Sequence, residues 1–335
     1  MNAEKVKAIV CLSSGLDSLL SAVIMKRLGI DVIGLHCMFR FDPVSQTDKP
    51  ARIRELIEPF DIPLVVKDTT DDFIKMFLDP DHGYGSEMNP CIDCRLLTLR
   101  YARDLMKETD ARFVVTGEVV GQRPMTQNKP TIFHIDKISG LKGLILRPLS
   151  ARLLPVTLPE QKGWVDREKL YDISGRGRKR QIALAEGFGL TDYNQPAGGC
   201  ILTDPQWAKR AQALLTRRSA ESMTADNIQL LRLGRHFWPA DHLWIIVGRD
   251  EADNRMLEKY QKGHWILHPT DFKGPLVLAE GIRDRRDLNL AARITARYCS
   301  RKDNGDFDIH YKINDEQGVL KVPPFEDKDI QDWRV

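Results

Sequence analysis

Short apolar runs alternate with amphipathic stretches along the first half of the chain. The runs have the length of strands, and in the stretches that follow them apolar residues recur at helical spacing. The predicted strands are residues 7–12, 31–38, 63–67 and 113–116, and the predicted helices are residues 18–28, 51–60 and 94–109. Strands that alternate with helices and are bounded by Gly-rich turns predict a doubly wound parallel α/β sheet. In such a fold, ligands bind at the carboxyl ends of the strands.

The pattern changes near residue 230. Five short strands are predicted from there on, at residues 243–247, 265–268, 276–279, 308–313 and 319–322, and one amphipathic helix at residues 283–298 lies among them. This order predicts a smaller α+β domain and not a continued alternation of strand and helix. We therefore predict an α/β domain over residues 1–205, a linker helix over 206–227 and a second domain over 228–335.

Composition and charge are those of a folded globular protein. Apolar residues make up 42% of the chain and charged residues 29%, and the formal net charge is only +3. Such a small net charge does not by itself indicate a nucleic-acid-binding protein, so any basic surface must be local. No apolar run reaches the about 18 residues of a membrane span, and the polar start of the chain differs from a signal peptide. We expect a cytoplasmic protein.

A Ser- and Gly-rich segment joins the first predicted strand to the first predicted helix. Backbone N–H groups at the start of a helix, next to the positive end of its dipole, form an anion site, and serine hydroxyls add donors. An ordinary helix N-cap needs only one such residue, so capping explains less of this segment. The residues predicted to bind phosphate are Ser13, Ser14, Gly15, Leu16, Asp17 and Ser18.

This segment resembles the S-G-G-x-D-S signature of the PP-loop ATP pyrophosphatases, with Ser14 in place of a glycine. Serine fits there if the backbone does not need a positive φ. The resemblance implies that ATP is cleaved between its α and β phosphates and that Asp17 holds Mg²⁺. It also implies an ATP site that includes His36, Thr116, Gly117 and Gln122.

Three of the six cysteines lie in predicted turns or at a helix start. Cys91 and Cys94 form a C-x-x-C pair at the beginning of a helix, and Cys200 ends a Gly-Gly-Cys turn. A helix N-terminus lowers the pKa of a thiol and favours the thiolate. A structural zinc site with His82 as fourth ligand, a redox disulfide and a three-cysteine [4Fe-4S] cluster with one open iron all fit these residues. The other three cysteines are predicted to be small buried residues: Cys11, Cys37 and Cys299.

Two further segments resemble one group of PP-loop enzymes. Residues 116–122 resemble the T-G-E-x-x-x-Q segment of 4-thiouridine synthetases, and residues 147–149 resemble the R-P-L stretch of the same enzymes. Taken in order with the loop and the cysteines, the resemblance to tRNA thiolases covers roughly residues 5–205. It implies ATP-dependent thiolation of a tRNA uridine, with sulfur carried as hydrosulfide on a [4Fe-4S] cluster or as a persulfide, and supplied by sulfide or a cysteine desulfurase. The presence of three cysteines, Cys91, Cys94 and Cys200, favours the cluster. The implied catalytic residues are Cys91, Cys94, Cys200 and Asp17.

The last third of the chain resembles an RNA-binding module of the NFACT-R type over residues 228–325. The resemblance lies in the V-G-R-x-x-x-x-N, W-x-x-H and G-P elements, which begin at Val247, Trp265 and Gly274. It implies that Arg249, His268 and Lys273 contact RNA. A packed α+β core with a buried, hydrogen-bonded histidine would explain the same residues without RNA.

A basic run links the two regions, and it is either a solvated loop or a patch that contacts the tRNA backbone. Its charged residues are Arg176, Arg178, Lys179 and Arg180. Two other functions remain open: a PP-loop sulfurtransferase for a small molecule, and a non-catalytic RNA-binding protein with a degenerate nucleotide fold. The thiolation hypothesis requires the three turn cysteines to converge beside the nucleotide site.

Overall fold

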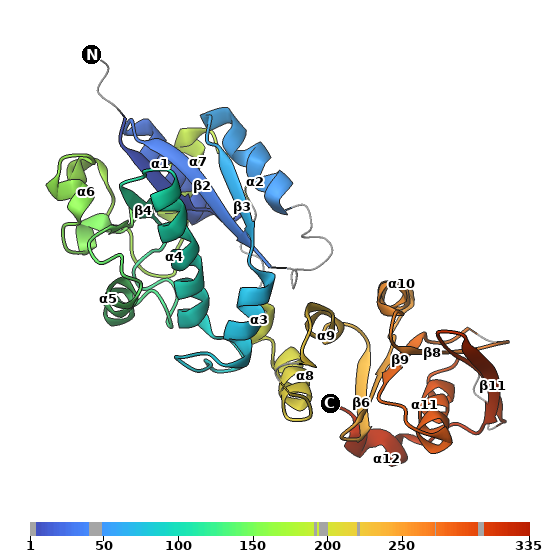
Figure 1. The fold of residues 1–335 in the computed structure, drawn as a ribbon. Coiled ribbons are helices and arrows are strands. Elements are labelled where there is room, and N and C mark those ends of the chain that lie inside the picture. Colours follow the sequence, from blue (N-terminus) through green and yellow to red (C-terminus); the bar gives the residue numbers. More distant parts are fainter. Residues whose placement is uncertain are drawn as a thin grey trace. The chain divides into compact units, whose positions relative to one another are not determined.

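The structure is a computed structural model that describes residues 5–39, 49–190, 193, 200–219, 222–271, 273–300 and 305–335. The chain forms two compact units, Met1–Cys200 and Ile201–Val335. The first unit is a parallel α/β domain and the second an antiparallel α+β domain, so the predicted fold class is confirmed (Figure 1).

The N-terminal unit is built on a five-stranded parallel sheet with the order β3-β2-β1-β4-β5. Its strands are β1 (Lys7–Cys11), β2 (Asp31–Met38), β3 (Leu64–Asp68), β4 (Phe113–Val115) and β5 (Ile145–Leu146). The chain adds β2 and β3 on one side of β1 and then β4 and β5 on the other. The order therefore reverses between β1 and β4, and this switch point is where open α/β sheets bind ligands.

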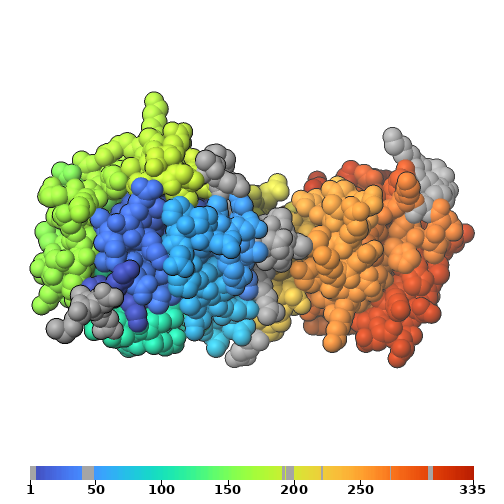
Figure 2. Space-filling model, turned by 90° about the horizontal axis from the view of Figure 1, so that it is seen from above, coloured from blue at the N-terminus to red at the C-terminus, as the bar shows by residue number. Residues whose placement is uncertain are grey.

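Helices cover both faces of this sheet. They are α1 (Leu16–Arg27), α2 (Lys49–Ile57), α3 (Thr70–Leu78), α4 (Cys91–Glu108), α5 (Lys129–Ile138), α6 (Leu158–Gln161) and α7 (Lys179–Phe188). Alternate residues of β1 enter different cores: Ala8 and Val10 pack on the side of α1, and Ile9 and Cys11 on the side of α4. Helix α7 packs against α1, and Figure 2 shows the yellow-green residues around α7 beside the blue N-terminal residues.

Two differences from the predicted elements matter for the site. Helix α4 begins at Cys91 and not at Cys94, so both thiols of the C-x-x-C pair lie in its first turn. The sequence pattern does not predict helices α3 and α5, and α5 carries a histidine that meets the loop before α4.

The C-terminal unit holds a six-stranded antiparallel sheet with the order β11-β10-β8-β9-β7-β6. Its strands are β6 (Arg235–Ala240), β7 (Leu243–Val247), β8 (Trp265–Pro269), β9 (Val277–Glu280), β10 (Phe307–Ile313) and β11 (Glu316–Val322). Its helices are α8 (Pro205–Leu215), α9 (Ala225–Leu230), α10 (Glu251–Leu257), α11 (Arg285–Arg297) and α12 (Asp327–Ile330). The apolar face of α11 packs on the sheet to form the core.

Among the described residues, no helix combines the length and the apolar character that crossing a membrane requires.

Candidate functional site

The switch point brings two predicted motifs into direct contact. The Ser13–Ser18 segment follows β1, and Gly117 follows the neighbouring strand β4. A Cβ atom on Gly117 would lie 2.5 Å from the backbone nitrogen of Ser18 and 2.6 Å from the carbonyl carbon of Asp17. Only glycine allows the two loops to pack this closely, which gives the T-G-E motif a structural reason.

The segment after β1 folds into a loop that is closed by its own hydroxyls. Ser18 Oγ accepts the N–H of Ser13 at 3.0 Å and lies 2.8 Å from the Ser13 carbonyl oxygen. Helix α1 starts with Gly15 as N-cap, and no side chain caps its first turn, so ordinary capping does not explain this run. Ser14 does not have a positive φ, so the serine fits where the PP-loop signature has glycine.

Asp17 lies buried at the mouth of this loop with one carboxylate oxygen held and the other not. Its Oδ2 accepts hydrogen bonds from Gln122 Nε2 at 2.7 Å and from an Arg178 guanidinium nitrogen at 3.2 Å. Its Oδ1 is buried and has no hydrogen-bond partner among the described residues. A buried carboxylate oxygen without a donor is suited to a metal ion, and Mg²⁺ in nucleotide sites is held by one or two carboxylates and the phosphates. Asp17 therefore fits the Mg²⁺ role.

The basic run divides into one residue of the site and three exposed residues. Arg178 reaches Asp17, whereas Arg180 pairs with Asp172 at 2.6 Å on the surface. Arg176 and Lys179 are exposed. Behind the site, the buried Gln181 of α7 lies with its Nε2 3.5 Å from Gln122 Oε1. Sequence reasoning misses Gln181, because a single glutamine on an amphipathic helix usually faces solvent.

The remaining residues predicted for ATP lie on the same edge of the sheet. His36 is buried on β2, and its Nδ1 lies 3.0 Å from the carbonyl oxygen of Leu12. Thr116 is fully buried, and its hydroxyl donates to Glu118 at 3.0 Å. These side chains shape the carboxyl ends of β2 and β4, next to the loop after β1.

A buried ion network connects the T-G-E, R-P-L and C-x-x-C segments. Glu118 accepts a hydrogen bond from Arg147 Nε at 2.8 Å, and its other oxygen lies 2.9 Å from Arg95 Nε. Arg147 also makes two bonds to Asp136, at 2.6 and 3.0 Å. Burial raises the pKa of Glu118, but the charges of Arg95 and Arg147 outweigh it and lower the pKa to about 2. The network fixes the start of α4 relative to the end of β4.

The C-x-x-C thiols occupy the first turn of α4. The Asn89 side-chain amide donates to Cys91 Sγ at 3.2 Å. Burial, followed by the nearby thiols of Cys200 and Cys91, raises the pKa of Cys94 from its usual 9.0 to about 12, against the lowering effect of Arg95. The expectation that the helix N-terminus lowers the thiol pKa is therefore wrong for Cys94, because burial and neighbouring sulfurs outweigh the helix dipole.

Cys200 lies close enough to Cys94 for the two thiols to affect each other's ionisation. The Gly-Gly turn before it, within residues 194–199, lies outside the described residues. In the described part of the chain, no three His, Cys, Asp or Glu side chains are arranged to hold a metal ion. The three thiols thus come near one another without forming a metal-binding group as they stand.

The other cysteines differ in their surroundings. Cys11 is buried as predicted, and its burial raises the pKa of this thiol to about 11. Cys37 is only half-buried and lies within electrostatic range of Cys11 and Cys94, which adds a further thiol near the C-x-x-C pair. Cys299 is half-buried against the core of the C-terminal unit.

His82, the predicted fourth ligand of a zinc site, has partners that are not thiols. Its Nδ1 lies 2.7 Å from Asp93 Oδ1, and its Nε2 lies 3.3 Å from Nε2 of His134 on α5. A zinc site formed by this histidine and the three cysteines is not present in the described residues.

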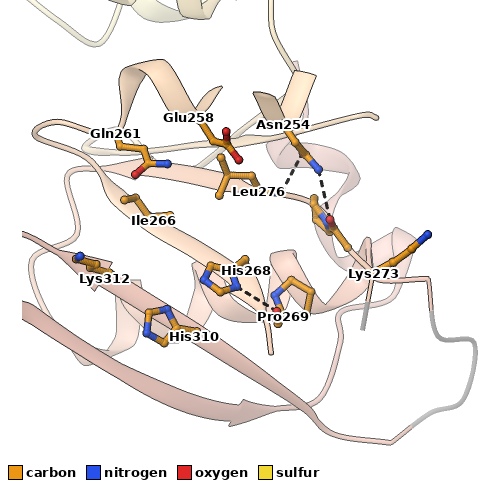
Figure 3. A pocket seen from close by; sticks show the side chains of 12 residues that line it. Asn254, Glu258, Gln261, Ile266, His268, Pro269, Lys273, Leu276, His310 and Lys312 are labelled. Atoms are coloured by element: carbon orange, nitrogen blue, oxygen red, sulfur yellow. Dashed lines mark hydrogen bonds between the residues drawn. The ribbon is translucent and has the colours of Figure 1, made fainter. Parts of the chain in front are cut away.

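The three residues predicted to contact RNA in the C-terminal unit have different roles. Arg249 is bound to the buried Asp253, with Nε–Oδ2 at 2.5 Å, and so helps to hold the fold. His268 is exposed, which contradicts the alternative of a buried core histidine. Lys273 and His268 line one cavity, shown in Figure 3.

The fold and the loops define the class of protein: a PP-loop α/β nucleotide domain is followed by a separate α+β unit. Residues 3–152 match the family described as thiamine biosynthesis protein (ThiI), and residues 234–334 match the NFACT protein RNA binding domain. The chain therefore carries a ThiI-like PP-loop domain of the tRNA-thiolation type and a C-terminal NFACT-R RNA-binding domain.

Distant relatives match this chain over different lengths. The tRNA-specific 2-thiouridylase MnmA of Lactobacillus johnsonii is 21% identical over 93% of this chain and 86% of its own. An MnmA of Clostridium botulinum is 34% identical over 32% of this chain and 33% of its own. Among solved structures, a 4-thiouridine synthetase–RNA complex with bound ATP is 17% identical with a TM-score of 0.37, covering 55% of this chain and 52% of that one. The U34-tRNA thiolase NcsA of Methanococcus maripaludis with its [4Fe-4S] cluster is 16% identical with a TM-score of 0.36, covering 69% and 74%.

Proposed function

We propose that the protein is an ATP-dependent tRNA sulfurtransferase that converts a uridine to a thiouridine. The observation that carries the proposal is the pairing of two features in one unit. A buried carboxylate oxygen of Asp17 is left without a donor among the described residues at the phosphate-binding loop, and Cys94 lies near both of the other turn thiols. The relatives named as tRNA 2-thiouridylases support the same reaction.

In the first step, the loop of residues 13–18 binds the phosphates of ATP, and Asp17 would hold a Mg²⁺ ion, which would supply positive charge to the phosphates. The carbonyl oxygen of the target uridine attacks the α-phosphorus, and the bond to the β-phosphate oxygen breaks. Pyrophosphate leaves, and the base carries AMP on its oxygen. Backbone N–H groups of α1 and the Arg178 guanidinium stabilise the charge that develops on the phosphates. AMP is a far better leaving group than oxide, which is why ATP is consumed.

In the second step, sulfur replaces the AMP. Cys91, Cys94 and Cys200 would hold a [4Fe-4S] cluster, and three cysteine donors leave one iron free. When bound, such a cluster supplies a site that carries sulfide. The donor set suits it, because crowded thiolates repel one another unless a cation neutralises them. The cysteines must approach one another more closely than they do here.

The alternative is a persulfide on Cys200. Its terminal sulfur attacks the adenylated carbon, and AMP leaves. Cys94, whose raised pKa means that its thiol must first lose a proton, then attacks Cys200 Sγ as the thiolate and breaks the sulfur–sulfur bond, so that the outer sulfur remains on the base. The product is a Cys94–Cys200 disulfide, which a dithiol reductant must reduce before the next turnover. The proximity of these two thiols supports this version.

Asp17→Asn tests the proposal. The wild-type protein should convert ATP to AMP and pyrophosphate only with tRNA, and mass spectrometry of the tRNA nucleosides should show a thiouridine. The variant should lose both activities and keep its fold. ATP turnover that ignores tRNA would favour a small-molecule substrate, and thiolation that survives the substitution would refute the PP-loop chemistry. Iron, sulfide and a visible absorbance band after anaerobic purification would favour the cluster over the persulfide.

A further inference from the structure

The C-terminal unit contains a cavity of about 500 Å³ between α10 with the following 3-10 turn and the outer face of β8 and β10 (Figure 3). Two histidines form its floor. His268 on β8 pairs with His310 on β10 in the sheet register, so both side chains leave the sheet on the same face. Their rings lie 4.9 Å apart with their planes tilted by 34°.

The same sheet face continues beyond the histidines. Val319 on β11 is opposite His310 in the register, and its side chain is 53% exposed. Burial, followed by the charges of His268 and Lys312, lowers the pKa of His310. An open sheet face with two adjacent imidazole rings and an exposed apolar neighbour offers a surface on which flat groups stack.

The charged residues of the cavity are separated from one another. Lys273 and Lys312 stand at opposite ends of the cavity in Figure 3, and Glu258 and Gln261 lie on the wall facing the histidines. A nucleoside triphosphate requires its cations together around one phosphate chain. Two separated lysines suit a strand that passes through, with a phosphate near each end, and Glu258 excludes phosphate from the middle.

The loop that carries Lys273 is held in place by the NFACT-R motif residues. Asn254 Oδ1 accepts the N–H of Leu276 at 3.0 Å, which fixes the segment after Gly274. A Cβ on Gly248 would lie 2.0 Å from Asn254 Oδ1, and a Cβ on Gly274 would lie 2.6 Å from Pro269 Cγ. Both glycines are thus needed for this loop to form one rim of the cavity. The V-G-R-x-x-x-x-N and G-P elements thus shape the cavity, but their arginine, Arg249, does not line it.

We propose that this cavity binds one unpaired nucleotide of an RNA strand, with the base stacked on His268 and His310 and the flanking phosphates near Lys273 and Lys312. Gln261 and Glu258 face the edge of the base. The proposal rests on the function proposed above, and it specifies how the C-terminal unit engages RNA: through a single-stranded segment and not through a duplex. A paired base cannot reach the imidazoles, because stacking requires it to leave the helix.

The test uses the full-length protein and a fluorescently labelled, unstructured oligouridylate of about six nucleotides, within the usual site size of single-strand binders. Binding is followed by fluorescence anisotropy. His268→Ala/His310→Ala should weaken binding about tenfold, as expected for the loss of one stacked base. His268→Phe/His310→Phe should bind close to wild type, because phenylalanine stacks but carries no charge. A blunt RNA duplex of the same length should compete poorly.

The lysines have a separate readout. Lys273→Ala/Lys312→Ala should lower the slope of log Kd against log salt by about 0.7 for each phosphate that a lysine no longer neutralises. Lys328→Ala removes an exposed lysine of α12 as the matched control and should leave the slope unchanged. Alanine variants of the histidines that bind like wild type, or a duplex that competes as well as the single strand, would overturn the proposal.

The outcome is distinguishable from a failure of the proposed function. If the cavity binds RNA for the thiolation reaction, the histidine variants should raise the KM for tRNA in AMP formation and leave kcat nearly unchanged. If the histidine variants bind the oligouridylate more weakly, as expected, but the wild-type protein shows no tRNA-dependent AMP formation, only the sulfurtransferase function is refuted. If the histidine variants bind the oligouridylate like the wild type and AMP formation is normal, only the proposed nucleotide binding by the cavity is refuted.

Discussion

Glu118→Gln should destabilise the N-terminal unit by about 3 kcal/mol at neutral pH. The amide has the size of the carboxylate but not its charge, so Arg95 loses its carboxylate partner and Arg147 keeps only Asp136. The magnitude follows from the pKa, which falls from 4.5 to about 2. At 1.36 kcal/mol per unit this corresponds to about 3 kcal/mol. Breaking a buried ion pair usually costs about 3–5 kcal/mol, in agreement.

The sign of the pH dependence is fixed by the direction of the shift. Because the folded-state pKa of Glu118 is lowered, its contribution is fully present above about 4.5 and is lost as the pH falls towards about 2. The difference in unfolding free energy between wild type and Glu118→Gln should therefore be largest at neutral pH. It should shrink as the pH is lowered below 4.5.

Urea unfolding, followed by hydrogen–deuterium exchange of peptides from β1 and β4, measures the unfolding free energy of the N-terminal unit separately from that of the C-terminal unit. Asp172→Asn is the matched control, because it removes a carboxylate that pairs with Arg180 on the surface and should leave the transition unchanged. A loss below about 1 kcal/mol, the range of surface pairs, would refute the reasoning. So would a loss that does not change between neutral pH and acid.

Three further predictions concern the site. Gly117→Ala should raise the KM for ATP by about tenfold or more, because the added Cβ would displace the loop at Ser18. Gly177 has open space around it, so Gly177→Ala should leave the KM for ATP unchanged in the same assay. Arg178→Ala should lower tRNA-dependent AMP formation about tenfold, because it removes one charge-assisted hydrogen bond. Arg176→Ala removes an exposed arginine and should leave AMP formation unchanged. Equal effects of the two variants would contradict the assignment of Arg178 to the nucleotide site. Cys94→Ser should abolish thiouridine formation, measured by mass spectrometry of the tRNA nucleosides. AMP formation should stay within about twofold of wild type, because adenylation precedes sulfur transfer. Loss of both activities would contradict this order of steps.

The sheet and the position of the nucleotide loop could be predicted from the sequence because both depend on local signals. An apolar run, a Ser- and Gly-rich turn and an amphipathic helix follow one another within residues 7–28, and chain order then implies a parallel sheet. The place of Gln122 also follows from the T-G-E-x-x-x-Q resemblance, and its contact with Asp17 lies where that resemblance implies.

The rest depends on contacts between segments far apart in the chain. Arg95 and Glu118 meet from different elements, and nothing near either residue in the sequence indicates the other. The pairing of His268 with His310 is set by the register of β8 and β10, which single-sequence patterns do not determine. The sequence-based expectation for the pKa of Cys94 is wrong, because the helix start is visible in the sequence but the burial and the neighbouring sulfurs are not.

The ion network at Glu118 has a consequence for how this domain can diverge. Two arginines, Arg95 and Arg147, are neutralised by two carboxylates, Glu118 and Asp136, so the loss of any one of the four leaves an unbalanced charge. We therefore expect the four positions to vary together among related chains. A chimaera that takes the C-x-x-C segment from one homologue and the R-P-L segment from another should fold only when both parents carry the same set of charged residues.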